Sequence, residues 1–254
     1  MIVTPSELLQ EDVDYGLLGG GAVSQLYTPD DKFEALCLDE SNAFTYVETP
    51  PHWWPLMSGP RVKTRDLPAS WHQNRWPPNK WLRPQYRRLG MGHGHSVIIL
   101  MLINRSAVSR AIQRDLRFNR VVDLNSSLGR SSRVNLSKVP GAVYVHLDDI
   151  GVFGVCRKLI EALRAAIYAE LVALNFVCTL EDPAVSGRYI GYRPTSFPAR
   201  WEPELAKLGG LDRLLELLEH SDWVHVDLVH TAVSIYVWMG LLWRPALSAP
   251  ASLF

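Results

Sequence analysis

Cysteine is scarce in this chain of 254 residues, and the few cysteines are scattered. Cys37, Cys156 and Cys178 lack the short spacings of metal ligands, so the sequence predicts no cysteine zinc site. Disulfides are typical of oxidising compartments and of small secreted domains. The simpler expectation here is a reduced, intracellular protein of the cytoplasm or the nucleus.

Long apolar runs are lacking as well. The most apolar stretch, residues 228–243, has 16 residues and contains His230, whereas a bilayer-spanning helix needs about 20 apolar residues. The first seven residues lack the basic region and apolar core of a secretory signal. We therefore expect no export and no membrane partner, and we expect residues 228–243 to form a buried helix.

The sequence has no net charge, because 26 basic and 26 acidic residues cancel. The two signs are nevertheless segregated along the chain. Residues 1–48 contain ten acidic side chains and only Lys32 as a basic one, whereas residues 61–88 contain eight basic side chains against Asp66. Such segregation is a feature of proteins that contact nucleic acid.

The basic segment 61–88 also carries Trp71, Trp76 and Trp81 among several prolines, which predicts an extended lobe or loop. Basic side chains neutralise phosphates and aromatic faces stack on unpaired bases, so the combination favours a single-stranded template. A second basic series shares one face of the helix expected after residue 96. The arginines assigned to nucleic-acid binding are Arg83, Arg87, Arg88, Arg110, Arg114 and Arg117. The alternatives are a solvated loop whose tryptophans cover the core, and a plain solvated helix face.

The most informative stretch is residues 143–153, in which two adjacent carboxylates, Asp148 and Asp149, separate two apolar runs. The runs predict short buried strands, so the carboxylates would lie at the tip of a hairpin. Burying a carboxylate costs several kcal/mol unless a partner neutralises it, and this stretch contains no Lys or Arg. A divalent cation such as Mg²⁺ is a suitable partner for two hard oxygen donors.

Asp39 stands in a similar setting, at the end of the apolar run 36–38. If it faces Asp148 across neighbouring strands, the three carboxylates would hold two ions about 3.5–4 Å apart, the arrangement that polymerases use. The alternative is an ordinary solvated Asp-Asp turn.

Five short segments are informative through their order and spacing. They are Asp39-Glu40-Ser41-Asn42-Ala43-Phe44, Leu89-Gly90-Met91-Gly92-His93-Gly94-His95-Ser96, His146-Leu147-Asp148-Asp149, Arg188-Tyr189-Ile190-Gly191-Tyr192 and Trp243-Arg244-Pro245-Ala246-Leu247-Ser248. In this order they resemble conserved segments of the reverse transcriptases. The first three are similar to the first palm motif, the second motif with its Met-Gly turn and serine, and the catalytic Asp-Asp hairpin. The last two are similar to the strand that grips the primer end and to a segment that follows the palm. The resemblance covers roughly residues 36–250.

Several positions depart from the family pattern. His146 stands where the third motif usually has Tyr, Gly90 stands where the second usually has Pro, and residues 173–179 contain no Lys. The family also places basic fingers residues before its first motif, where this chain has only Lys32. These departures suggest a truncated or decayed copy, or one completed by an upstream polypeptide that contains the fingers.

The pattern of apolar runs along the chain predicts an α+β fold. The resemblance implies a palm-like antiparallel sheet backed by helices and a helical C-terminal subdomain. Apolar positions at helical spacing predict helices over residues 157–174 and 204–219. We expect three parts along the chain. They are an acidic N-terminal segment 1–35 left from the fingers, a palm-like catalytic domain 36–195 that includes the lobe 61–88, and a thumb-like or connection-like helical region 196–254.

The function implied by the resemblance is RNA-directed DNA polymerisation of retroelement origin, in which a deoxynucleoside triphosphate (dNTP) extends a DNA primer on an RNA template. Asp39 and Asp148 would be the principal ligands of Mg²⁺ or Mn²⁺, with Asp149 supporting them. Phe44 would lie under the sugar and exclude a 2′-hydroxyl. The other substrate-binding residues would be Gly92 and Ser96 at the nascent base pair, and Ile190, Gly191 and Tyr192 at the primer end.

Two alternatives belong to other functional classes. A catalytically inactive palm fragment would keep the fold and bind nucleic acid or a protein, and the acidic N-terminal segment and missing fingers favour it. A metal-dependent nuclease would use the same carboxylates but would need neither Phe44 nor the segment 189–192. The three intact carboxylates favour an enzyme, because they are costly to bury without a cation.

Overall fold

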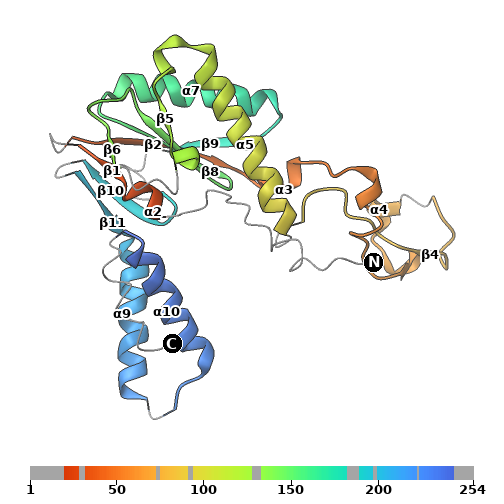
Figure 1. Ribbon diagram of the computed structural model, residues 1–254. Coiled ribbons are helices and arrows are strands. Elements are labelled where there is room, and N and C mark those ends of the chain that lie inside the picture. The colour runs from red at the N-terminus through yellow and green to blue at the C-terminus, as the bar shows by residue number, and fades with distance from the viewer. Residues whose placement is uncertain are drawn as a thin grey trace. The chain divides into compact units, whose positions relative to one another are not determined.

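A computed structural model of the chain describes residues 20–28, 32–72, 75–90, 94–127, 133–181, 189–196, 199–221 and 223–242 (Figure 1). These residues fall into two compact units. The small unit consists of residues 42–100, and the sheet unit consists of residues 20–41 together with 101–242. The basic lobe expected at residues 61–88 lies inside the small unit.

The sheet unit is built around five strands that are rich in apolar residues. In sheet order they are β5 (Val122–Asp123), β7 (Ala142–His146), β8 (Asp149–Gly154), β2 (Glu34–Glu40) and β9 (Cys178–Glu181). β5 is parallel to β7, and the other neighbouring pairs are antiparallel. Strands β2, β7 and β8 are buried along most of their length, which explains their continuous apolar runs.

Two long helices connect these strands. α5 (Gly94–Arg114) precedes the hairpin of β7 and β8, and α7 (Arg157–Ala173) lies between β8 and β9 along the chain. In space β8 is inserted between β2 and β7, so the order β2-α5-β7-β8-α7-β9 forms a split β-α-β arrangement. The expected α+β class is confirmed, and the helix predicted at residues 157–174 is present as α7.

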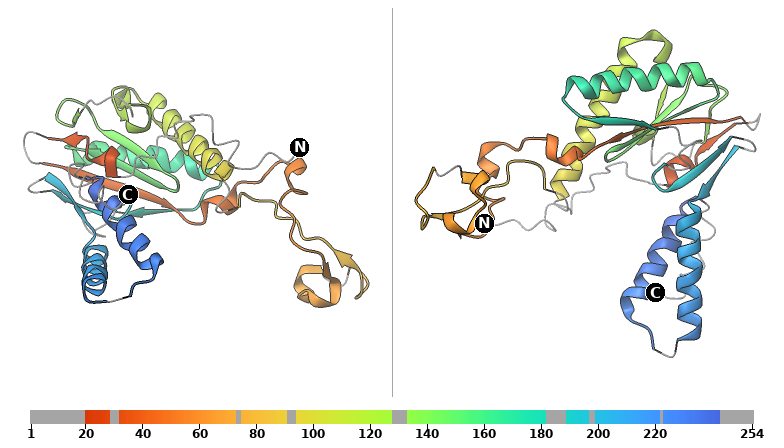
Figure 2. Two further views of the ribbon diagram at one scale, coloured as in Figure 1. Left: turned by 60° about the horizontal axis from the view of Figure 1, so that its bottom comes forward. Right: turned by 180° about the vertical axis from the view of Figure 1, so that it is seen from behind.

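One face of the sheet packs against α7. The helix buries Ile160, Leu163, Ile167 and Leu171, which repeat at helical spacing. Gly154 of β8 lies against Ile160, and side chains alternate along a strand, so Ile150 and Val152 belong to the same face. Figures 1 and 2 show α7 on this side of the sheet and the hairpin of β10 and β11 on the other.

The opposite face carries an aromatic core beneath the hairpin of β10 (Tyr192–Ser196) and β11 (Ala199–Pro203). Phe33 stacks on Phe153 with ring centroids 6.1 Å apart, and Trp201 of β11 meets both rings edge-on. Tyr189 is buried beside them and its hydroxyl donates to the Tyr144 carbonyl oxygen at 2.9 Å. The hairpin is thereby fixed to the sheet by burial of large aromatic area.

Shorter elements complete the sheet unit. They are α2 (Gly20–Val23), β1 (Leu26–Tyr27) paired in parallel with β6 (Val134–Asn135), the 3₁₀ helix η3 (Leu116–Phe118) and α6 (Leu124–Ser127). Ala22 and Val23 of α2 and Leu124 of α6 belong to the same buried cluster as Phe153.

Two helices, α9 (Leu205–His220) and α10 (Val226–Gly240), form the C-terminal part. Within the sheet unit, Tyr192 of β10 joins α10 to the β10–β11 hairpin. Its ring stacks on Trp238 at 4.1 Å, and its hydroxyl donates to the Trp238 carbonyl oxygen at 2.6 Å. The helix expected at residues 204–219 is confirmed as α9. Within α10 only Ala232 and Gly240 are buried among the described side chains, so the expectation of a buried helix there is wrong. No helix in the described part of the chain is long and apolar enough to cross a bilayer.

The small unit contains short elements joined by irregular chain. They are α3 (Ala43–Tyr46), the 3₁₀ helices η1 (Pro51–Trp53) and η2 (Thr64–Asp66), α4 (Ala69–His72) and the antiparallel strands β3 (Val62–Lys63) and β4 (Trp81–Leu82). Thr64 is fully buried, and its hydroxyl contacts the carbonyl oxygens of Pro77 and Lys80. One buried side chain thus holds the proline-rich segment to η2.

The absence of a side chain at Gly151 is a packing requirement of the sheet. A Cβ atom at this position would lie 2.6 Å from the Tyr189 ring and closer still to Phe153. We expect Gly151→Ala to lower the free energy of unfolding by about 1–3 kcal/mol, because the core is overpacked. Gly210 on α9 has open space around it, so Gly210→Ala should raise stability by about 0.5–1 kcal/mol. Urea unfolding would measure both, and an unchanged Gly151→Ala midpoint would contradict the described packing.

Candidate functional site

Asp39 and Asp149 lie directly opposite each other on β2 and β8. The amide of Glu40 donates to the carbonyl oxygen of Asp148 at 3.0 Å, which makes Asp39 and Asp149 a non-hydrogen-bonded pair. In such pairs the Cα atoms are only about 4.5 Å apart and the side chains leave the same face. The register therefore brings Asp39 opposite Asp149, and not opposite Asp148 as considered from the sequence, because Glu40 takes the position opposite Asp148.

Their face of the sheet follows from the alternation of the strands. Cys37 on β2 and Gly151 on β8 are each two residues from the aspartates and face the aromatic core, not α7. His146 pairs with Asp149, and Thr179 of β9 pairs with Asp39. One row across four strands thus contains His146, Asp149, Asp39 and Thr179.

The third predicted carboxylate, Asp148, occupies the two-residue turn between β7 and β8. Partial burial raises its pKa, a backbone hydrogen bond lowers it, and the charge of Asp39 raises it again. The side chains of Asp148 and Asp39 are therefore close enough to interact electrostatically. This environment differs from the ordinary solvated turn that was the alternative at the sequence level.

A polar cavity of about 280 Å³ lies next to the aspartate pair. Its lining residues are Cys37, Asp39, Asp149, Glu181, Tyr189, Ile190 and Gly191. Segments that are distant along the sequence, the end of β2, the start of β8 and the turn before β10, meet there. The cavity unites Asp39 and Asp149 with the predicted primer-end residues Ile190 and Gly191.

The turn beside the cavity has an unusual backbone. Tyr189 and Tyr192 exchange backbone hydrogen bonds of 2.7 and 2.8 Å, while Ile190 and Gly191 have φ angles of 44° and 83°. A Cβ at Gly191 would meet Trp238 at 2.5 Å and the Lys207 amine. Glycine is therefore required there for both conformation and space. Tyr192 does not line the cavity, since its ring stacks on Trp238.

The remaining predicted substrate residues lie elsewhere. Phe44 is half-buried in α3 and Ser96 is buried near the start of α5, and both belong to the small unit. Gly92 lies outside the described residues, as do Arg188 and the segment 243–248. The predicted roles of Gly92 and Ser96 at the nascent base pair and of Phe44 under the sugar stay predictions.

The helix arginines assigned to nucleic-acid binding are paired within the protein. Arg110 and Arg114 of α5 both pair with Glu170, a buried carboxylate of α7, the first at 2.8 Å. Arg117 pairs with Asp115 at 2.6 Å. The two pairs with Glu170 connect α5 to α7 and stabilise a buried charge inside the sheet unit. Arg117 lies in η3, beyond the end of α5, so the expectation that it shares a helix face with Arg110 and Arg114 is wrong. Their binding of nucleic acid stays a prediction, with the ion pairs as competing partners.

The arginines of the small unit are exposed. Arg87 stacks over the Trp54 ring at 4.2 Å, and Arg88 lies 3.9 Å from Glu48, whereas Arg83 is an exposed side chain. Trp71 and Trp81 are 68% and 58% exposed and Trp76 is 37% exposed. These tryptophans therefore do not cover a core, which was the alternative interpretation of the basic segment.

Two groups near the site were missed at the sequence level. Glu181 lines the cavity from β9, and Glu40 is buried on the opposite face of β2 from Asp39. The alternation of β2 predicts that adjacent acids face opposite sides, so the signal for Glu40 was present. Glu181 had no local signal, because only the pairing of β9 with β2 brings it near Asp39.

Burial is the main cause that raises the pKa of Glu40 to about 8. Asn104 lowers it, and the charges of Asp148 and Asp39 raise it further. The contact with Asn104 is electrostatic and not a well-aligned hydrogen bond, because both Glu40 carboxyl oxygens and Asn104 Oδ1 lack a hydrogen-bond partner among the described residues. Glu40 is thus expected to be protonated at neutral pH.

The oxygen donors suit a divalent ion whose coordination shell is completed by substrate atoms. Within the described ranges, no group of three or more His, Cys, Asp or Glu side chains forms a ready metal site. Mg²⁺ is usually held by one or two carboxylates plus phosphate oxygens and water, and Asp39 with Asp149 supplies that number. The raised pKa of Asp148 also indicates a carboxylate that a nearby cation would stabilise.

No protein-family model matches the chain, and no curated protein is significantly similar to it.

Glu40 gives the site a measurable pH dependence. Its pKa is raised from 4.5 to about 8 on folding, so the folded state holds a proton that the unfolded state releases between these values. The contribution of Glu40 to the free energy of unfolding should therefore be fully present below the lower pKa value. It should fall by roughly 1.4 kcal/mol per pH unit as the pH rises toward the upper pKa value. We expect Glu40→Gln to remove this decline.

Urea unfolding at several values between about pH 5.5 and 7.5 would measure the slope. Glu216→Gln on the exposed side of α9 is the matched control, and it should keep the slope of the wild type. Equal slopes for the wild type and Glu40→Gln would show that Glu40 is ionised in the folded protein.

Proposed function

We propose that this chain is an RNA-directed DNA polymerase of the reverse transcriptase type, built on a palm-like sheet. The observation that carries the proposal is the cavity in which Asp39 and Asp149 meet the turn of Ile190 and Gly191. These residues come from three of the segments that resemble reverse transcriptase motifs. Their convergence in one cavity is what a palm requires.

The topology gives separate support. A palm needs its acidic strands at the centre of a sheet, with helices behind and the acids on the opposite face. Here β2 and β8 are central neighbours, α7 covers one face and the aspartate pair lies on the other. Both strands are buried, which is the rigid support that a positioned metal site needs.

Asp39, Asp148 and Asp149 would hold Mg²⁺ or Mn²⁺. When bound, the ion would supply Lewis-acid stabilisation as the primer 3′-hydroxyl oxygen bonds to the α-phosphorus of dNTP and pyrophosphate leaves. The turn of Ile190 and Gly191 would position the primer end beside the aspartates.

Other groups would act around this centre. Lys207 contacts Gly191 and places its amine 4.1 Å over the Trp238 ring, so a cation is available for a backbone phosphate near the cavity. Phe44, only a few residues after Asp39, would exclude the 2′-hydroxyl. Gly92 and Ser96 would line the nascent pair.

Primer extension tests the activity directly. The purified chain, given an RNA template, a DNA primer, dNTPs and Mg²⁺ or Mn²⁺, should extend the primer. The variants Asp39→Asn and Asp148→Asn with Asp149→Asn should lose activity by about a hundredfold or more, since each removes metal ligands worth several kcal/mol. Asp212→Asn, an exposed acid on α9, is the control that should retain activity.

No extension by folded wild-type protein would favour the second candidate, a palm-derived module that binds nucleic acid without polymerising. The exposed tryptophans among the basic residues of the small unit favour this role specifically. Extension that survives loss of the aspartates would contradict both the metal site and the polymerase.

Binding of single-stranded RNA by the small unit is expected in either case. Because one base stacked on an aromatic side chain contributes about 1–3 kcal/mol, we expect Trp71→Ala or Trp81→Ala to weaken binding by roughly 5- to 150-fold. Trp223→Ala is the matched control, since Trp223 is 94% exposed but lies in the sheet unit. Fluorescence anisotropy at several salt concentrations measures the effect. Equal affinities for all three variants would contradict stacking by the small unit.

A further inference from the structure

The tip of the aspartate hairpin is held from behind by one helix. The Asn104 side chain of α5 donates from Nδ2 to the Leu147 carbonyl oxygen at 2.8 Å. The Leu147 amide in turn donates to the sulfur of Met101, one turn earlier on α5, at 3.2 Å. Both backbone polar groups of Leu147 are thereby bound to α5 side chains.

Leu147 needs this support because its backbone is unfavourable. Its φ angle is 58°, in the left-handed region that favours glycine and is strained for a leucine. Strained residues persist only where the surrounding structure holds them, and they are concentrated at functional sites. Leu147 directly precedes Asp148 and Asp149, so a change at this residue would reorient both carboxylates.

Asn104 is a costly residue for mere packing. It is completely buried, and its Oδ1 atom has no hydrogen-bond partner among the described residues. A buried polar atom without a partner is destabilising, and an apolar side chain of the same shape would avoid that cost. An apolar side chain would, however, leave the Leu147 carbonyl oxygen without this donor. The well-aligned hydrogen bond that Asn104 makes is to the hairpin tip, and its amide also contacts the buried Glu40 carboxyl group.

We propose that Asn104 is a positioning residue for the metal-binding carboxylates, acting through Leu147 with Met101 as its assistant. By fixing the strained tip, Asn104 keeps Asp149 opposite Asp39 and holds the turn that carries Asp148. The inference rests on the proposed function for the role of the carboxylates. It adds the helix residue that sets their geometry, comparable to the outer partners that orient ligands in metal sites.

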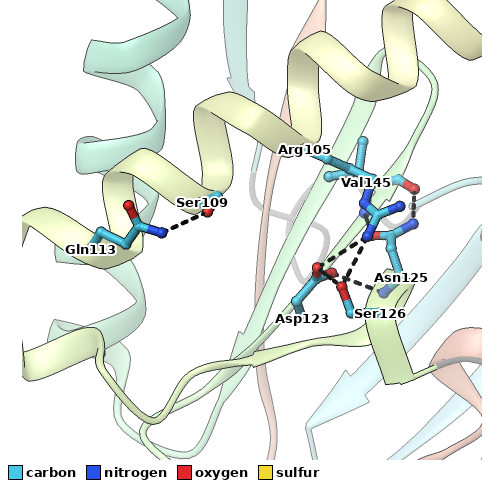
Figure 3. Close-up of polar contacts among 7 residues, drawn as sticks. All are labelled: Arg105, Ser109, Gln113, Asp123, Asn125, Ser126 and Val145. Carbon is cyan, nitrogen blue, oxygen red and sulfur yellow. Dashed lines mark hydrogen bonds and ion pairs between the residues drawn. The ribbon is translucent and has the colours of Figure 1, made fainter.

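The chain offers a matched control in Asn125. This asparagine is 5% exposed, and its side chain exchanges two hydrogen bonds of 2.8 Å with the backbone of Val145, on the same strand two residues before the tip. Figure 3 shows this pair beside the cluster of Arg105, Asp123 and Ser126. Asn125 thus contacts β7 but not the turn. Its loss should destabilise the sheet without freeing Leu147.

The test compares Asn104→Leu with Asn125→Leu in the full chain, by two readouts that do not require polymerase activity. Hydrogen exchange over residues 143–153 reports the tip, and Mn²⁺ titration reports the carboxylates. In Asn104→Leu the amides of the tip should exchange at least about tenfold faster. Mn²⁺ affinity should fall by about 10- to 100-fold, the usual effect of losing an outer partner of a metal site. In Asn125→Leu thermal stability should fall while Mn²⁺ affinity stays near that of the wild type.

The outcomes separate this inference from the proposed function. Unchanged tip exchange in folded Asn104→Leu overturns the inference whatever the polymerase assay shows. If the tip amides of Asn104→Leu exchange faster but the wild type binds no Mn²⁺, Asn104 holds the tip and the proposed metal site is overturned. If Asn104→Leu does not fold, Met101→Leu decides, because it nearly conserves volume but removes the sulfur acceptor. Tip exchange and Mn²⁺ affinity equal to those of the wild type in Met101→Leu would overturn the inference.

Discussion

The antiparallel register between β2 and β8 is the constraint on which the site depends. It sets Asp39 against Asp149 as a close, non-hydrogen-bonded pair, and a shift by one residue would send one of them to the opposite face. The register is strongly specified because both faces of these strands are buried, against α7 on one side and the aromatic core on the other. The packing of the strands against α7 and the aromatic core therefore determines that Asp39 lies opposite Asp149.

The same sheet separates its acidic groups according to face. Asp39 and Asp149 reach a polar cavity, whereas Glu40, their immediate neighbour, is directed to the helix side and has its pKa raised by burial to about 8. On that side Asn104 lies between Glu40 and the hairpin tip. Two carboxylates thus face the cavity, and the carboxyl group behind them is expected to be neutral.

Basic residues are used in two ways in this chain. Arg110 and Arg114 of α5 pair with the buried Glu170 of α7, which connects the two helices, and Arg117 of η3 pairs locally with Asp115. In the small unit they stay exposed beside tryptophans that contact solvent. Basic residues that are close together in the sequence occur in both situations, so the location of acidic partners from other elements distinguishes a structural ion pair from an exposed surface.

The sequence by itself determined the local elements and the order of the polar residues. The buried strands around Asp39 and Asp148-Asp149, the helices α7 and α9, and the α+β class follow from apolar patterns within short windows. Tertiary structure alone decided that Glu181 joins the cavity, that Glu170 takes the helix arginines and that Asn104 holds the strained Leu147. The physical reason is that these contacts join segments that are far apart in the sequence. Strand pairing and helix packing bring them together, and no periodic sequence pattern predicts which segments will meet.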